Sequence, residues 1–236
     1  LRNRAGSQTR WSGSANYQSN ELADNTWRVG ASLSVRPSPS LQLSVEPSFR
    51  NEHGTRATFS GPINRQYLTT LSGGRPETFG NRYVFGLPDR TTLSMQMRVS
   101  YTFKPDLTLD VYAEPFAASA QYDAFGETAL PGARDLRIYG VDGTTISRLL
   151  DGSYVVTDGD ATFSLRNRDF NIRSFRSNVV LRWEWRPGST LFVVWQQNRE
   201  SFVAQGQNVG FGDLFESLTA SGDHIFAVKT TLWSSR

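Results

Sequence analysis

The chain of 236 residues contains no cysteine and only two histidines. Without cysteine it has neither a disulfide framework nor a thiolate metal site. It also lacks any stretch approaching the roughly 20 consecutive apolar residues that a membrane-spanning helix requires, which excludes a helical membrane protein. The same absence is compatible with a membrane β-barrel, because barrel strands are only about 9 to 11 residues long and every second side chain faces the lumen.

Alternation between apolar and polar residues is the main feature that is present. In the segment 92–103, Leu93, Met95 and Val99 alternate with polar residues. Such a period of two is typical of a β-strand with two different faces. Three short proline turns join segments of this kind in pairs, so the repeated unit is a β-hairpin. The turns are Arg36-Pro37-Ser38-Pro39-Ser40-Leu41, Lys104-Pro105-Asp106-Leu107 and Arg186-Pro187-Gly188-Ser189-Thr190-Leu191.

Short and long connections alternate along the chain. The segments 51–65, 121–172 and 204–223 are long and rich in Gly, Asp, Asn and Ser, as expected of the outer loops of an outer-membrane barrel. We predict a single all-β domain over 1–236, an antiparallel up-and-down transmembrane β-barrel with the proline turns and both chain termini at one end. The expected strands, about ten in number, lie near 12–20, 26–36, 41–51, 64–71, 81–87, 91–104, 107–119, 174–186, 190–203 and 224–233.

The composition of the polar faces indicates what they meet. Lysine is scarce, since Lys104 and Lys229 are the only two among 25 basic residues. The polar positions hold Ser, Thr, Gln and Arg with scattered Glu, which favours a wetted lumen over the Lys-rich and Glu-rich exterior of a soluble sheet. The alternative is a soluble β-sandwich, in which the same apolar residues form an ordinary core.

Charged residues on these polar faces are the candidate functional residues. Rings of fixed charge bias which ions or solutes cross a pore. In a barrel of only ten strands, the same charges would instead pair with one another and plug the lumen. More strands upstream would favour the pore. The candidate lumen charges are Arg28, Glu46, Arg50, Arg98, Asp110, Glu114, Arg176, Arg182 and Glu184.

Aromatic residues mark the expected membrane interface. Tyr101, Phe103, Trp183 and Trp185 lie just before turns, where an aromatic girdle would sit. The expected partners are outer-membrane lipid, lipopolysaccharide bound by outward arginines near the rim, and other envelope proteins. Nucleic acid is not expected, because the arginines are spread through the strands with no basic tract and the net charge is only +3.

A hydrolase is the rival hypothesis from another class. Nucleophilic hydrolysis uses a serine with a histidine and an orienting group, but His53 and His224 both lie in or beside predicted outer loops and there is no G-x-S-x-G motif. Glu46 and Glu114 are candidates for a glycosidase pair, whose separation sequence does not reveal. We therefore expect no enzyme.

No cofactor or metal site is expected either. Asp151, Asp158 and Asp160 offer oxygen ligands, but their spacing does not match a calcium-binding loop. A hydrophilic turn is the favoured interpretation, because Asp and Gly are common in turns.

Three segments resemble one known family. They are the run 169–197, which contains Arg182-Trp183-Glu184-Trp185-Arg186-Pro187-Gly188-Ser189-Thr190, and the shorter runs FGNRYVF (79–85) and YAEPFAAS (112–119). These are similar to the C-terminal barrel of proteins classed as domain of unknown function 5916. The resemblance implies a bacterial outer-membrane β-barrel, and members typically carry an upstream domain resembling carbohydrate-binding family 9. It implies no activity for particular residues.

The two ends of the sequence favour a piece of a longer protein. The chain begins at Leu1 without a signal segment, so we expect the C-terminal part of a larger protein. Outer-membrane barrels commonly end on an aromatic residue, whereas Trp233 is followed here by three further residues. We expect a pore, transport or membrane-anchoring component, linked to glycan binding through the upstream domain. The alternatives are a structural subunit of an outer-membrane complex with a plugged lumen, and an outer-membrane hydrolase.

Overall fold

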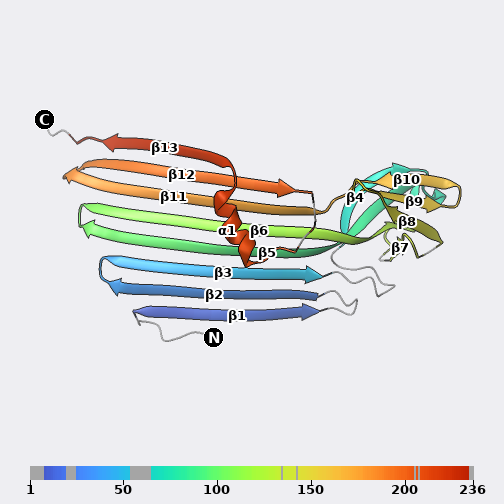
Figure 1. Cartoon of the computed structure of the whole chain (residues 1–236), viewed down its shortest axis with the longest axis horizontal. Coiled ribbons are helices and arrows are strands. Elements are labelled where there is room, and N and C mark those ends of the chain that lie inside the picture. Colours follow the sequence, from blue (N-terminus) through green and yellow to red (C-terminus); the bar gives the residue numbers. More distant parts are fainter. Residues whose placement is uncertain are drawn as a thin grey trace.

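The computed structural model describes residues 8–19, 25–53, 65–133, 135–141, 143–204, 206 and 208–233. One antiparallel sheet runs through this part in the order β1-β2-β3-β5-β6-β11-β12-β13 (Figure 1). The all-β, antiparallel class predicted from the alternation is confirmed. The strands of this path are β1 (Thr9–Ser19), β2 (Asn25–Ser38), β3 (Leu41–His53), β5 (Asn81–Lys104), β6 (Leu107–Thr128), β11 (Phe170–Arg186), β12 (Ser189–Val203) and β13 (Gly222–Thr231).

Two of the expected strands are arranged differently from the prediction. The segments 81–87 and 91–104 form one continuous strand, β5, and the register shift between Leu87 and Pro88 accommodates a proline that has no N–H to donate. The strand expected at 64–71 is β4 (Gln66–Ser72), which pairs with residues 81–86 of β5 and lies off the main path. The main path therefore has fewer strands than predicted.

The three proline turns lie at the same end of the sheet, as predicted (Figure 1). They join β2 to β3, β5 to β6 and β11 to β12, and β1 begins and β13 ends at this turn end. Gly188 in the last turn has a φ of +78°, and a Cβ there would lie 2.9 Å from the Cβ of Trp233. Both the backbone angle and the close approach require glycine at this position.

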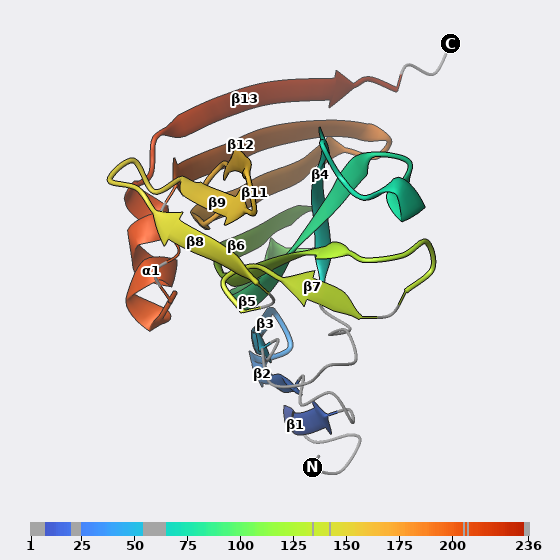
Figure 2. The same cartoon turned by 90° about the vertical axis from the view of Figure 1, so that its right-hand side faces the viewer.

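The segment 121–172 is folded, so the prediction of an outer loop there is wrong. β6 continues to Thr128, and β7 (Leu136–Ile138) pairs with it. A separate three-stranded sheet follows, made of β8 (Thr144–Arg148), β9 (Tyr154–Asp158) and β10 (Ala161–Leu165). We call residues 66–87 and 120–170 the crown, which includes β4 and the 3₁₀ helix η1 (Pro76–Thr78). Figure 2 views the molecule from this end.

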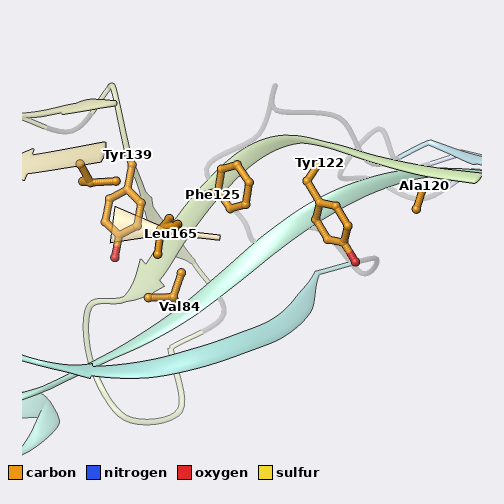
Figure 3. Packing of buried hydrophobic residues seen from close by; sticks show 7 residues of the cluster. Val84, Ala120, Tyr122, Phe125, Tyr139 and Leu165 are labelled. Carbon is orange, nitrogen blue, oxygen red and sulfur yellow. The ribbon is translucent and has the colours of Figure 1, made fainter. Parts of the chain in front are cut away.

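The crown has a hydrophobic core of its own (Figure 3). On the β9–β10 hairpin, Phe163 lies opposite Val156 and Leu165 lies opposite Tyr154, so this hairpin presents one apolar face. That face packs on apolar side chains from β5 and β6, which removes both from water. The buried members of the cluster are Val84, Ala120, Tyr122, Phe125, Tyr139, Val156 and Leu165.

The segment 204–223, also expected to be a loop, contains a short helix. α1 (Phe211–Glu216) continues into the 3₁₀ helix η2 (Ser217–Thr219). Val209 and Leu214 are buried against Leu93 and Ala117 of the main sheet. Of the expected outer loop 51–65, residues 54–64 lie outside the described residues, as do the three that follow Trp233.

Both edges of the main sheet are free in the part of the chain that the structure describes. β1 pairs with β2 alone and β13 pairs with β12 alone, so the described strands form an open sheet and not a closed barrel. None of the helices found in the described ranges is long and apolar enough to cross a membrane.

Candidate functional site

The strand register places all nine candidate lumen charges on one face of the sheet. Arg28 lies opposite Arg50, and Glu114 lies opposite Arg176. Residues directly opposite one another in an antiparallel pair point to the same side. The other five follow from the same pairing and from the alternation along each strand. We call this the polar face; its remaining candidate charges are Glu46, Arg98, Asp110, Arg182 and Glu184.

A hydrogen-bonded cluster surrounds Glu114 on the polar face. The Tyr112 hydroxyl donates to Oε2 of Glu114 at 2.6 Å, and Nε2 of Gln96 donates to Oε1 at 3.4 Å. The Arg98 guanidinium lies 5.1 Å from the centre of the Tyr112 ring, within cation–π range. Beside the cluster, Glu114 and Arg176 line a hollow of about 240 Å³. The arrangement juxtaposes one carboxylate and two guanidinium groups across three strands.

A groove lined by serines continues the polar face toward β1. It has a volume of about 400 Å³, and Glu46 and Gln96 are the long polar side chains along it. Hydroxyl groups supply both donors and acceptors without a fixed charge. The serine-lined part of the groove therefore offers a wettable surface without fixed charge, and Glu46 supplies one carboxylate along it. Its serines are Ser12, Ser14, Ser32, Ser48 and Ser94.

Pairs of opposite charge lie toward both ends of the polar face. At the turn end, Arg182 donates to Glu184 at 3.0 Å, and the other carboxylate oxygen of Glu184 accepts the backbone N–H of Gly188 at 3.0 Å. Toward the crown, Arg50 pairs with Glu52. Arg28, Glu46 and Asp110 are exposed on the same face. The structure thus gathers most of the candidate charges into local clusters along one surface.

The opposite side of the sheet is the apolar face. Trp11 lies opposite Leu33, and Val193 lies opposite Val228. Leu33 is 45% exposed and Val228 59% exposed, so the described residues leave about half of each side chain uncovered. Apolar side chains on this face are accessible along both edge strands, where a soluble sheet would bury them.

Aromatic side chains lie near both ends of the apolar face. At the turn end, the predicted girdle residues contact one another in pairs, with ring centres 4.5 Å apart for Tyr101 and Phe103 and 6.4 Å apart for Trp183 and Trp185. Tyr101 lies opposite Leu109, and Trp183 lies opposite Leu107, which places both on the apolar face. At the other end, Tyr17 and Trp27 form a pair that our sequence analysis missed, with ring centres 4.5 Å apart.

The register also gives the separation of the two aromatic levels. Trp27 lies opposite Asn51, which lies opposite Thr91. Thr91 is ten residues from Tyr101 along β5. At about 3.3 Å per residue, this corresponds to about 33 Å along the strand.

A buried ionic network holds the crown together. Arg82 of β5 donates to Glu127 of β6 at 3.0 Å and lies 2.8 Å from Asp158 of β9. Arg137 of β7 binds both oxygens of Asp158 at 2.7 Å, and the Tyr139 hydroxyl donates to Glu127 at 3.2 Å. Sequence reasoning missed this network, because its members are far apart in the chain.

The network shifts the pKa values of its members. The hydrogen bond from Arg137 holds the pKa of Asp158 well below its ordinary value, against the opposing effect of burial. Burial raises the pKa of Tyr139, and the neighbouring Glu127 carboxylate raises it further. Asp158 is therefore ionised and held by arginines at neutral pH, in a structural role.

The two histidines have partners other than serine in the structure. Nδ1 of His53 lies 2.6 Å from a carboxylate oxygen of Asp89. Nδ1 of His224 lies 3.2 Å from Nε2 of Gln197, and its ring stacks on Trp195 at 6.1 Å. These partners do not form the serine and histidine pair that hydrolysis would need.

Two of the acidic residues considered as calcium ligands, Asp151 and Asp158, have different partners in the structure. Asp151 accepts hydrogen bonds from the backbone and hydroxyl of Ser153 at 2.9 and 2.6 Å, a turn-forming arrangement. Asp158 belongs to the ionic network described above. Within the described ranges, no group of three or more His, Cys, Asp or Glu residues is placed to hold a metal ion.

Fold and surface together define a class of protein: an antiparallel β-sheet protein with one polar and one exposed apolar face and, at one end, a crown with its own core. Residues 3–233 match the family described as Domain of unknown function (DUF5916). The chain belongs to this family. No curated protein and no solved structure matches the chain.

Proposed function

We propose that this sheet forms part of the wall of a bacterial outer-membrane β-barrel that acts as a pore or transport component. In this proposal, the apolar face contacts membrane lipid and the polar face lines a wetted lumen. The single observation that carries the proposal is the exposure of the apolar face, on which Leu33 and Val228 are each about half exposed. In water such a surface is unfavourable, because the free energy that burial of apolar area would contribute is not gained. In lipid the same surface is solvated.

The dimensions of the apolar face support the same proposal. The two aromatic levels are about 33 Å apart along β5 at about 3.3 Å per residue. Barrel strands tilt by about 35–45°, which reduces that length to a band roughly 25 Å tall. This is the height of the apolar band of outer-membrane barrels, and the aromatic pairs Tyr17–Trp27 and Tyr101–Phe103 then lie at its two borders.

Closure of the barrel decides whether the lumen conducts. The free edges of β1 and β13 need partners in lipid, where unpaired backbone groups cost several kcal/mol each. If the eight strands paired edge to edge, side chains such as Tyr112 and Arg98 would fill the interior, because about eight strands leave room for side chains alone. Further strands between the two edges would open a water-filled channel. The pore hypothesis therefore requires strands in addition to those described.

A membrane anchor with a plugged lumen is the second candidate function. The Glu114 cluster favours it, since Tyr112 and Gln96 already satisfy both carboxylate oxygens and leave less free charge to act on a solute. In this alternative, the barrel is a structural subunit that holds the rest of the protein, or other envelope proteins, at the lipopolysaccharide-containing surface.

Single-channel conductance of the purified full-length protein in a planar bilayer tests both candidates. Stepwise conductance is expected from a pore, and Arg98→Glu is expected to shift ion selectivity toward cations, because it reverses a charge on the polar face. Arg166→Glu makes the same charge change at an exposed position of the crown and controls for the net charge of the protein.

The outcomes separate the two functions. A conducting barrel whose selectivity changes with Arg98→Glu and not with Arg166→Glu supports a pore lined by the polar face. Conductance that neither variant alters argues against the polar face as the selectivity filter. Silence from a barrel that is folded in the bilayer rejects the pore and favours the anchor.

A further inference from the structure

The short helical segment between β12 and β13 lies on the apolar face of the sheet. α1 and η2 contact β6 and β11, and α1 also contacts β5; Figure 1 shows α1 crossing in front of these strands, and Figure 2 shows it to one side of the sheet. Val209 and Leu214 are buried against Leu93 and Ala117, which belong to the apolar face through their opposition in the register. The segment is thus packed on the proposed lipid-facing surface.

Both acidic side chains of α1 pair with one arginine of the sheet, Asp213 from a largely buried position and Glu216 from an exposed one. Arg173 of β11 lies 2.7 Å from a carboxylate oxygen of Asp213 and also pairs with Glu216. Arg199 of β12 donates to the backbone carbonyl of Leu218 at 2.7 Å. Arg173 thus balances one of the two carboxylate charges of α1; Asp213 is largely buried against it, whereas Glu216 is 61% exposed.

The aromatic side chains of α1 face away from the sheet. Phe211 is 69% exposed and Phe215, one helical turn later, is 62% exposed. A helix that rests on a protein in water turns its apolar residues inward and its charges outward. In α1, Leu214 is buried as expected and Asp213 is paired against the sheet, but the exposed side carries both phenylalanines together with Glu216.

The position of α1 along the strands is close to the aromatic level of Trp27, since Leu214 packs on Leu93 and Ala117, two residues from that level toward the turn end. Trp27 is level with Thr91, Ser119 and Asn171 through the register of β3, β5, β6 and β11. These three residues are polar and buried. Strands β5, β6 and β11 thus contribute no aromatic side chain of their own at this level, and α1 lies over them.

We propose that α1 and η2 form an interfacial membrane element in which Phe211 and Phe215 insert among the acyl chains just below the headgroups of the outer leaflet. The segment completes the outer aromatic girdle over strands that lack one. The inference rests on the proposed function, because it assumes that the apolar face contacts lipid. It follows from the continuity of the exposed phenylalanines with that face, from their position near the Trp27 level, and from the pairing of Asp213 and Glu216 with Arg173.

Spin labelling tests this inference, and the absence of cysteine from the chain makes it direct. A nitroxide is attached to Phe215→Cys in the full-length protein, with any cysteine outside these 236 residues replaced by serine, and the protein is inserted into vesicles of phospholipid and lipopolysaccharide. Its collisions with O₂, which concentrates in hydrocarbon, and with a water-soluble nickel chelate are measured. Leu33→Cys, midway along the apolar face, is the lipid reference, and Asp160→Cys, exposed in the crown, is the water reference.

The expected result is a shift of the Phe215→Cys label toward high O₂ and low nickel accessibility, as at Leu33→Cys and unlike Asp160→Cys. If Leu33→Cys reports lipid and Phe215→Cys reports water, the inference about α1 is overturned and the proposed function stands. Protection of the Phe215→Cys label from both reagents indicates contact with protein and also overturns it. If Leu33→Cys itself reports water, the proposed function fails and the inference fails with it.

Discussion

The crown and the main sheet differ in how far their apolar side chains are buried. In the crown, Val84, Phe125 and Tyr139 are almost completely buried, and so are the ionic partners Arg82 and Glu127. In the main sheet, apolar side chains such as Leu33 remain about half exposed, and polar side chains occupy the other face. The crown thus carries its own core, whereas the sheet presents two surfaces suited to two different media.

This difference teaches which region depends on its surroundings. The apolar side chains of the crown are buried against one another, so the stability of the crown follows from packing and from paired charges. Much of the sheet's apolar face is not covered by another described element. The described elements that pack on this face are confined to the crown side of β5, β6, β11 and β12. Substitutions in the crown should therefore change stability through packing and through pH-dependent charge pairs, whereas substitutions in the main sheet should change stability through contact with the membrane.

The largest expected effect is in the ionic network of the crown. Glu127→Gln removes the charge that Arg82 and Arg137 share, and breaking a buried pair costs about 3–5 kcal/mol because it leaves an uncompensated buried charge. We expect faster hydrogen exchange of the amides of β8 to β10. Glu77→Gln, an exposed glutamate of η1, is the matched control and should leave exchange unchanged. Equal exchange in both variants would contradict a stabilising role for the network.

A smaller effect is expected on the apolar face. Leu33→Arg places a charge midway between the two aromatic levels, and arginine on the lipid face near the bilayer midplane costs about 2–4 kcal/mol. Ser32→Arg places the same residue on the polar face, where a wetted lumen accommodates it. Urea titration of the protein folded in vesicles is expected to show destabilisation by the first variant alone. Equal stability of the two variants would contradict the assignment of one face to lipid and the other to a wetted lumen.

The smallest expected effect is the pH dependence of the crown. The folded-state pKa of Asp158 lies below its ordinary value of 3.8 because Arg137 donates to its carboxylate. This stabilisation is complete well above pH 3.8 and is lost progressively as pH falls through the folded-state pKa, since the open state binds the proton more readily. The protection of β9 amides, which is the exchange rate compared with the intrinsic rate at the same pH, should therefore fall in acid, and Asp158→Asn should weaken that fall. A variant with undiminished acid sensitivity would assign the effect to other carboxylates.

Local sequence patterns were sufficient for the main sheet. The alternation around Met95 and Val99 identified the part of β5 from 91 onward and its two faces, although 81–87 was predicted as a separate strand, and the proline turns identified three hairpins with their turns at one end. The shared face of Arg98, Glu114 and Arg176 also followed, because a strand's side chains alternate whatever its neighbours are. Their detailed contacts did not follow: that Tyr112 and Gln96 bind Glu114 depends on which strands are adjacent.

The crown and α1 were missed for identifiable reasons. Abundant Gly and Asp in 121–172 suggested a loop, although Tyr154, Val156, Phe163 and Leu165 alternate around a turn at Gly159 and form a hairpin. α1 spans only six residues, too few for a helical period to emerge. Its position depends on contacts with Leu93 and Ala117, which are about a hundred residues away in the chain.

By itself, the sequence determined the antiparallel strands, their turns and the division of each strand into an apolar and a polar side, because these depend on neighbours within a few residues. Only the tertiary structure decided the open edges of the described sheet, the crown with its buried Arg82–Glu127–Asp158 network, and the orientation of α1, with Asp213 paired against the sheet and Phe211 and Phe215 outward. These features arise from pairing and packing between distant segments, which no local pattern encodes.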